Sequence, residues 1–173
     1  MPLTLADGRT KLTLLTEVPD DLSAIPLDVL NTGIEASCKI NKPDYRLSPA
    51  ASDTVPDQAL CQEGNAVTFG NSNYEGTLTV LRFLDATGKP EDTEDVVWPL
   101  LRTKGATVVA VERIGPKYNV PWAAGDEYQA YHVITDNPQK PSDMAGYVKS
   151  VVPLGVQNAE LNGVVAAAAG GGA

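Results

Sequence analysis

The chain has 173 residues, of which 43% are hydrophobic and 20% charged, and its formal net charge is −9. These values are typical of one globular domain and exclude a wholly disordered chain, a collagen and a coiled coil. The acidic excess disfavours binding to nucleic-acid phosphates or anionic membranes, and no apolar run reaches the ~20 residues that span a bilayer.

Short β-type segments follow one another along the chain, separated by turns rich in Pro, Gly, Asn and Asp. Alternating polarity and β-branched or aromatic residues predict strands at 11–18, 34–40, 65–69, 74–84, 106–114, 126–135 and 146–156, with a brief pairing at 45–47. Residues 20–33 are expected to form a loop, since Pro26 disfavours a full helix there. The absence of βαβ alternation predicts mainly antiparallel pairing.

One segment, residues 91–105, is a good helix candidate. Its acidic residues are expected in the first turn of the helix, Gly105 is expected to end it, and Pro99 to kink it or shift its start. The predicted fold is therefore mainly β: an antiparallel β-sandwich or open barrel with a single α-helix between the fourth and fifth major strands. The acidic residues at the start of the candidate helix are Glu91, Asp92, Glu94 and Asp95.

The predicted organisation is an N-terminal arm at 1–10, one domain at 11–157 and a flexible, Ala/Gly-rich tail at 158–173. Within the domain, residues 42–63 form a long, irregular loop. Loops of this length without regular structure are uncommon in compact domains and are often functional.

Residues that could support chemistry are few. His132 is expected to be a satisfied strand histidine, while Cys38 and Cys61 are expected to be reduced and buried, with a disulfide as the alternative. Phosphate-binding glycine loops, nucleophile elbows and metal-ligand spacings are missing from the sequence. We therefore predict no catalytic, cofactor-binding or metal-binding residue, and no enzyme activity.

A series of motifs in a fixed order gives the sequence a family resemblance. The run SDTVPDQALCQEGNAVTFGNSNYEGTLTVLRF at 52–83 is followed by EDTEDVVWPLL, by VERIG at 111–115, by AGDE at 124–127 and by TDNPQ at 135–139. In this order and spacing the motifs resemble those of the major tail tube proteins of long, non-contractile (siphovirus-type) bacteriophage tails, over residues 11–157. Pro99 inside the helix departs from the family pattern.

The resemblance implies a structural virion protein that self-assembles into rings, usually hexameric, which stack into the tail tube. It implies tape-measure, tail-tip and terminator proteins as partners, and DNA that passes through the lumen during ejection without specific binding. The protein would be assembled in the bacterial host cytoplasm and end in the virion tail. Inter-ring contacts are expected from the long loop, at Pro49, Asp53, Val55, Asp57 and Leu60.

Other functions stay open at this point. A tail terminator or baseplate ring protein would form one ring without polymerising. A ligand- or carbohydrate-binding β-sandwich would be monomeric, with the long loop over a pocket. An enzyme built around His132 would lose its activity in His132→Ala.

Overall fold

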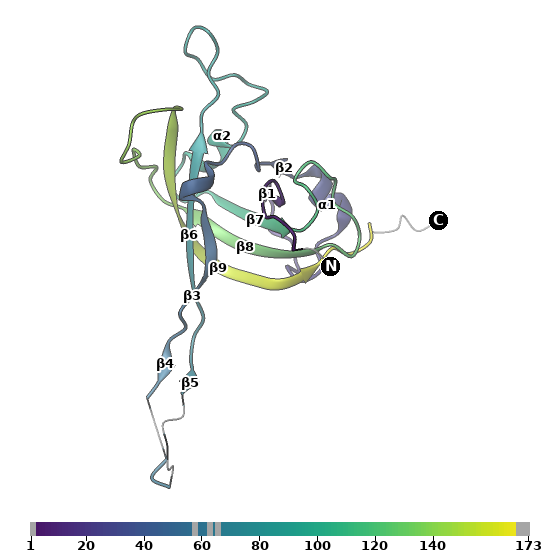
Figure 1. Ribbon diagram of the computed structural model, residues 1–173, viewed down its shortest axis with the longest axis vertical. Coiled ribbons are helices and arrows are strands. Elements are labelled where there is room, and N and C mark those ends of the chain that lie inside the picture. The colour runs from purple at the N-terminus through teal and green to yellow at the C-terminus, as the bar shows by residue number, and fades with distance from the viewer. Residues whose placement is uncertain (1–2, 57–58, 62–63, 65–66, 169–173) are drawn as a thin grey trace.

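A computed structural model describes residues 3–56, 59–61, 64 and 67–168 (Figure 1). In this part of the chain, seven strands form one sheet in the order β2-β1-β7-β8-β9-β6-β3, and every neighbouring pair is antiparallel. The strands are β1 (Thr10–Leu15), β2 (Ile34–Glu35), β3 (Arg46–Ala50), β6 (Asn73–Leu81), β7 (Thr107–Ile114), β8 (Glu127–Thr135) and β9 (Lys149–Val164). A separate ribbon pairs β4 (Thr54–Val55) with β5 (Thr68–Phe69). The helices are α1 (Leu27–Thr32), the 3-10 turn at Lys42–Asp44 and α2 (Trp98–Leu101). The prediction of a mainly-β, antiparallel fold is confirmed, with α2 between the fourth and fifth strands of the main sheet.

The sheet curls until its two ends meet at one seam. Ile40, which follows β2, forms an antiparallel bridge with Val80 of β6. The Asn41 N–H donates to the Thr79 carbonyl and the Leu81 N–H donates to the Lys39 carbonyl, both at 2.8 Å. These bonds close the sheet into a barrel at the end where β6 finishes, which satisfies strand edges that would otherwise be open.

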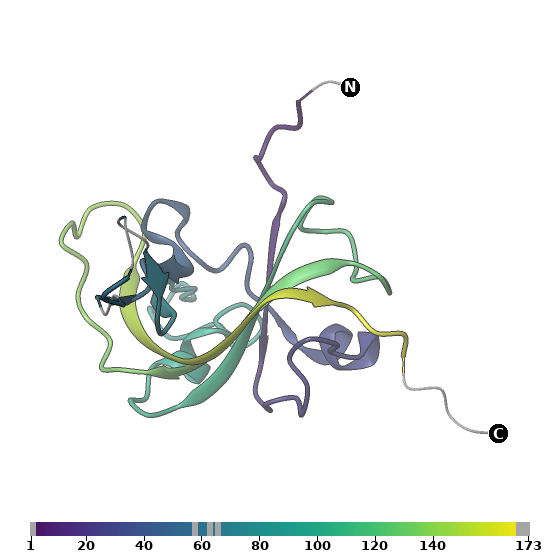
Figure 2. The same ribbon diagram turned by 90° about the horizontal axis from the view of Figure 1, so that it is seen from below.

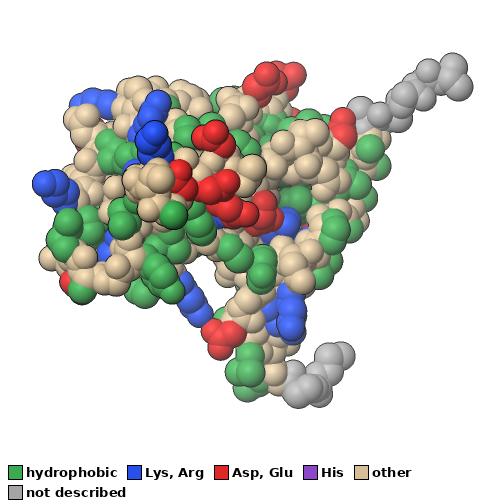
Figure 3. Space-filling view, turned by 90° about the horizontal axis from the view of Figure 1, so that it is seen from above, with side chains coloured by type: hydrophobic (Ala, Val, Ile, Leu, Met, Phe, Trp, Pro, Cys, Tyr) green, Lys and Arg blue, Asp and Glu red, His purple; other side chains and the backbone are tan. Residues whose placement is uncertain are grey.

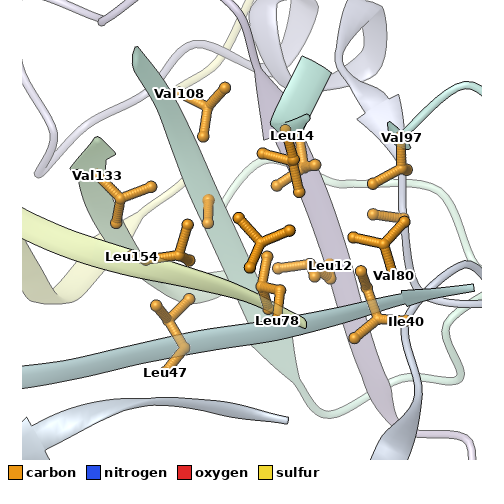
Figure 4. Close-up of a cluster of buried hydrophobic side chains, with 14 of the residues drawn as sticks. Leu12, Leu14, Ile40, Leu47, Leu78, Val80, Val97, Val108, Val133 and Leu154 are labelled. Atoms are coloured by element: carbon orange, nitrogen blue, oxygen red, sulfur yellow. The ribbon is translucent and has the colours of Figure 1, made fainter. Parts of the chain in front are cut away.

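Two hydrophobic clusters lie on opposite faces of the curled sheet. Successive strand side chains point to opposite faces, so β7 places Val108 and Ala110 inside the barrel and Val109 and Val111 outside. The inner cluster gathers side chains from several strands and from α2, and they point toward one another (Figure 4). The outer cluster packs α1 and Trp122 against the other face.

The predicted strand at 34–40 and the loop at 20–33 both needed correction. Only Ile34 and Glu35 pair with β1, because the chain then turns, with the Lys39 N–H bonded to the Ala36 carbonyl, and crosses to β6. Residues 27–32 form α1, for which Pro26 is the N-cap. Proline is tolerated there because a helix leaves the first N–H groups unpaired.

The candidate helix at 91–105 is much shorter than expected. It is reduced to α2, with Pro99 in the first turn, where it breaks no helical bond. The acidic residues precede the helix and act elsewhere: Glu91 accepts from the Glu94 N–H at 2.8 Å, and the buried Asp95 forms an ion pair with Arg82 at 2.8 Å. The prediction that these acids stabilise a helix N-terminus was therefore wrong.

The last strand continues past the predicted end at 156, so residues 158–164, expected in the tail, belong to β9. Gly163 of β9 pairs with Tyr128, and a Cβ at Gly163 would lie 2.2 Å from the Tyr128 ring. That ring is fixed, since its hydroxyl donates to the Leu22 carbonyl and accepts from the Ile25 N–H, both at 2.8 Å.

We expect Gly163→Ala to lower the free energy of unfolding by about 2 kcal/mol, because overpacking a held ring forces the strands apart. Gly155→Ala on the same strand is the matched control, since its Cβ would make only ordinary van der Waals contacts, with the end of the Gln157 side chain at 3.5 Å and the Ile134 carbonyl at 3.7 Å. Urea denaturation measures both variants. Equal stabilities of the two variants would show that the Tyr128 contact is not a constraint.

Candidate assembly surfaces

The most prominent feature outside the barrel is a hairpin arm, residues 51–72. β3 and β6 are antiparallel partners, and their pairing runs from Arg46 opposite Thr77 to Ala50 opposite Asn73. Beyond this last pair, both segments leave the barrel side by side. Backbone bonds between Asp53 and Asn71 and between Gly70 and Asp53 lead into the β4–β5 ribbon. Figure 1 shows the arm projecting far below the barrel.

The hairpin arm exposes apolar side chains. Leu60 is fully exposed, and Phe69 and Val67 are 72% and 66% exposed. All four residues of the β4–β5 ribbon are exposed, so no layer covers either face. Because an isolated two-stranded ribbon is only marginally stable in water, and exposed apolar side chains mark contact sites, the arm has the properties of a docking element for another chain.

The predicted contact residues are distributed along this arm and its base. Pro49 lies in β3, Asp53 accepts from the Asn73 side-chain amide at 3.0 Å, Val55 lies in β4 and Leu60 lies near the far end. Asp57 lies outside the described residues.

Within the predicted irregular loop at 42–63, residues Lys42–Asp44 form a 3-10 turn, and β3 and β4 form the outgoing side of a hairpin. Val67 and Phe69 on the returning half are exposed apolar residues that the sequence analysis did not include among the candidate contacts. The predicted strand at 65–69 could have indicated the hairpin, because it directly follows the loop at 42–63 and neighbouring segments of a chain commonly pair with each other.

The base of the hairpin arm is tied to the barrel by a buried polar contact. Tyr45, directly before β3, donates its hydroxyl proton to Glu112 of β7. Burial raises the pKa of Glu112, although the hydrogen bond from Tyr45 opposes the rise. Burial and the nearby Glu112 charge raise the pKa of Tyr45, and burial raises that of the neighbouring Tyr131 to about 12.

We expect the stability of the wild-type chain to fall with rising pH across the interval between 4.5, the ordinary pKa of Glu112, and its raised pKa. In that interval the unfolded chain has released the proton and the folded chain still holds it. Glu112→Gln should therefore gain stability relative to wild type as pH rises, as measured by urea denaturation from pH 4 to 8. The exposed Glu127→Gln is the control, and the account fails if both variants show the same pH profile.

A pocket of about 280 Å³ opens in the barrel wall beside β1, and we call it the seam pocket. Leu12 of β1 and Ile40 give it an apolar lining, and Tyr45 and Tyr118 also border it. The N-terminal residues 6–10 run along its rim, where the Tyr118 N–H donates to the Gly8 carbonyl at 2.9 Å.

The N-terminal segment leaves the barrel beyond this rim (Figure 2). Leu3 and Leu5 are 100% and 80% exposed. Asp7 forms an exposed ion pair with Lys42 at 2.8 Å. At the pole opposite the hairpin arm, acidic side chains gather near the centre of the surface, with Lys and Arg mainly toward its edges (Figure 3).

The side chains considered for chemistry do not form a site. Cys38 and Cys61 are free and exposed, so the prediction that they are buried was wrong. His132 lies in β8, and its Nε2 atom is buried without a hydrogen-bond partner in the part of the chain that the structure describes. Over the same residues, no group of three or more His, Cys, Asp or Glu is placed to hold a metal ion. No helix among them is long and apolar enough to cross a membrane.

Comparisons with known proteins agree with this picture. The family model described as "Phage tail tube protein" matches residues 1–169. A solved structure described as the cryo-EM structure of the anti-feeding prophage (AFP) baseplate, 6-fold symmetrised, superposes with a TM-score of 0.51 at 13% identity. That match covers 94% of this chain and 98% of the other, and it supports the fold. No curated protein matches the chain. The chain belongs to the phage tail tube protein family and is a structural component of a phage tail.

Proposed function

We propose that this protein self-assembles into hexameric rings that stack into the tube of a long, non-contractile phage tail. The tube serves as the conduit for DNA ejection. Its partners are further copies of itself and the tape-measure, tail-tip and terminator proteins, and it is assembled in the host cytoplasm. The N-terminal arm at 1–10 and the C-terminal tail add contacts between neighbouring copies.

The observation that carries the proposal is the hairpin arm. It holds apolar side chains away from the barrel, where none of the described residues buries them. A projecting element that docks on a different surface of the next copy makes a head-to-tail contact, and such contacts repeat along an axis. The proposal of six copies per ring draws on the solved neighbour, which is 6-fold symmetrised.

The charge of the chain suits a conduit. With 22 acidic and 13 basic residues, the surface repels phosphates on average. DNA inside such a tube would move without gripping the wall, whereas a basic lumen would bind it in a salt-dependent way.

Sedimentation velocity at rising protein concentration, with negative-stain micrographs of the same samples, tests the proposal. We expect growth into large particles above a threshold concentration and hollow tubes of constant width. Growth that stops at single rings would contradict tube formation and favour the tail terminator.

A further inference from the structure

We propose that a second pocket in the barrel binds an alkylammonium group, either a free aliphatic amine or the side chain of a lysine. This pocket has a volume of about 270 Å³ and lies where β7 ends, β8 begins and β9 ends. We call it the acidic pocket, and the lining residues that carry the argument are Glu112, Ile114, Glu127, Gln129, Asn162 and Val164. The inference goes beyond the proposed assembly, because one copy of the chain contains the whole site.

Strand register brings the polar groups of the acidic pocket together. Glu112 of β7 is the direct cross-strand partner of Gln129 of β8. Glu127 lies two residues from Gln129, so both side chains point to the same face of β8. Direct and diagonal cross-strand neighbours are within reach of long side chains, so one small ligand can touch all three groups.

The strand β9 adds an amide through a β-bulge. Its residues pair with β8 at Gly163 opposite Tyr128 and at Glu160 opposite Ala130. Two residues of β9 therefore stand opposite the single residue between Tyr128 and Ala130, and one of the two is Asn162. A bulge re-aims the side chain that it carries, which explains how Asn162 reaches the pocket lining.

The carboxyl groups of the acidic pocket have no cation to balance them. Glu112 is 7% exposed, and the Tyr45 hydroxyl donates to only one of its oxygens, which leaves the other without a hydrogen-bond partner among the described residues. In the same part of the chain neither Glu112 nor Glu127 forms an ion pair, and the described lining contains no Lys or Arg. Because a buried, unpaired charge is costly, an entering cation would be held strongly.

The apolar rim selects the kind of cation. Ile114 and Val164 line the pocket and are 70% and 44% exposed, whereas Glu112 is buried. A lysine-like group lays its methylene chain along apolar surface and places its charged head on polar groups. The volume exceeds the ~150 Å³ of a cavity that holds benzene, so a four-carbon amine fits.

Binding should release a proton from Glu112. Burial raises the pKa of this carboxyl group, whereas an aliphatic amine stays charged up to about pH 10. An ammonium group favours the ionised carboxylate, so its affinity should rise with pH until Glu112 is ionised without it. Across β7, the partner of Glu112 on β1 is the uncharged Leu12. The other titratable groups around Glu112 are Tyr45, Tyr74, Tyr128, Tyr131 and Glu127.

The probe for this site is n-butylamine, which reproduces the end of a lysine side chain. NMR titrations of the unassembled full chain follow the side-chain amides of Gln129 and Asn162. We expect saturable shifts whose midpoint falls to lower amine concentration between pH 5 and pH 8. Ammonium chloride, which lacks the carbon chain, should bind more weakly, and n-butanol, which lacks the charge, should give no saturable shift.

Three variants test which groups hold the amine. Glu112→Gln should weaken binding at pH 8 about tenfold, as for loss of one hydrogen bond to a charged group, and should remove the pH dependence. Glu127→Gln, at an exposed position that leaves the core intact, should also weaken binding. Glu17→Gln, which is exposed and outside the acidic pocket, is the matched control and should bind like wild type.

Three outcomes would overturn the site. They are equal binding of n-butanol and n-butylamine, displacement of the amine by calcium chloride acting on the same amides, and unchanged affinity in Glu112→Gln. The first would indicate an apolar pocket and the second a divalent-cation site. Because binding is measured on the unassembled chain, these results do not depend on whether tubes form.

Assembly in the presence of n-butylamine distinguishes the two sources of the ammonium group. If the amine raises the threshold concentration for assembly, the natural occupant is a lysine of a neighbouring copy, a result that rests on the proposed self-assembly. If the amine binds and leaves the threshold unchanged, the occupant is a free amine. Either result supports the site.

Discussion

A chain in which residues 51–72 are replaced by Asn-Gly should fold normally and form no tubes. Ala50 and Asn73 are direct cross-strand partners, so a two-residue turn closes the shortened hairpin in register. Among the residues of 51–72 that the structure describes, none belongs to either hydrophobic cluster. We therefore expect the free energy of unfolding to stay within about 1 kcal/mol of wild type.

Loss of assembly in this variant follows from the loss of the exposed apolar side chains that the hairpin arm carries. A variant in which a Gly/Ser linker of the same length replaces the arm is the matched control for the length of the segment. This variant should also fail to assemble. Circular dichroism and urea denaturation check the fold, and micrographs check for tubes. Normal tubes from either variant would show that the arm is not an assembly element.

The second large effect is expected at Arg113, which is 1% exposed. Its guanidinium donates to the Asp126 carboxylate at 2.6 Å and to the carbonyls of Pro121 and Val120 at 3.0 and 2.9 Å. It also stacks over Trp122, at 5.0 Å from the ring centre. This side chain thus contacts several points of the connection between β7 and β8, which also brings Tyr118 to the seam pocket.

Arg113→Met should lower the free energy of unfolding by about 3–5 kcal/mol, because it leaves the Asp126 carboxylate and several carbonyls without their donor. Arg102→Met, at an exposed position, should change it by less than about 0.5 kcal/mol. Urea denaturation measures both variants.

Adding Asp126→Leu to Arg113→Met should restore part of the loss, since the uncompensated charge is removed with its partner. A loss below about 1 kcal/mol for Arg113→Met would mean that water replaces the guanidinium at little cost.

The strands that form the barrel were predictable from runs of β-branched and aromatic residues and, where one face is exposed, from alternating polarity. β7 and β8 lie within a residue of the predicted 106–114 and 126–135, since both faces are covered by apolar layers that the sequence mirrors. Alternating polarity indicates which face of a sheet a side chain occupies, but it does not indicate which strand lies next to it. It therefore could not show that the chain after Glu35 leaves β1 and forms a bridge with Val80.

The misread segments depend on contacts between distant residues. The acidic run before α2 looked like a helix start, but Asp95 is fixed by Arg82, and Glu94 by Lys39. The hairpin arm looked irregular because its polar, turn-rich sequence lacks a buried face to impose alternation. The seam pocket is lined by residues from three separate stretches of the chain, so only the folded barrel brings it together.

A cryo-electron microscopy reconstruction of the assembled wild-type protein tests the central claim most directly. The account predicts a hollow tube of stacked six-fold rings in which the hairpin arm of each copy lies against a copy in the adjacent ring. Rings that do not stack, or a tube in which the hairpin arm contacts no neighbouring copy, would contradict it.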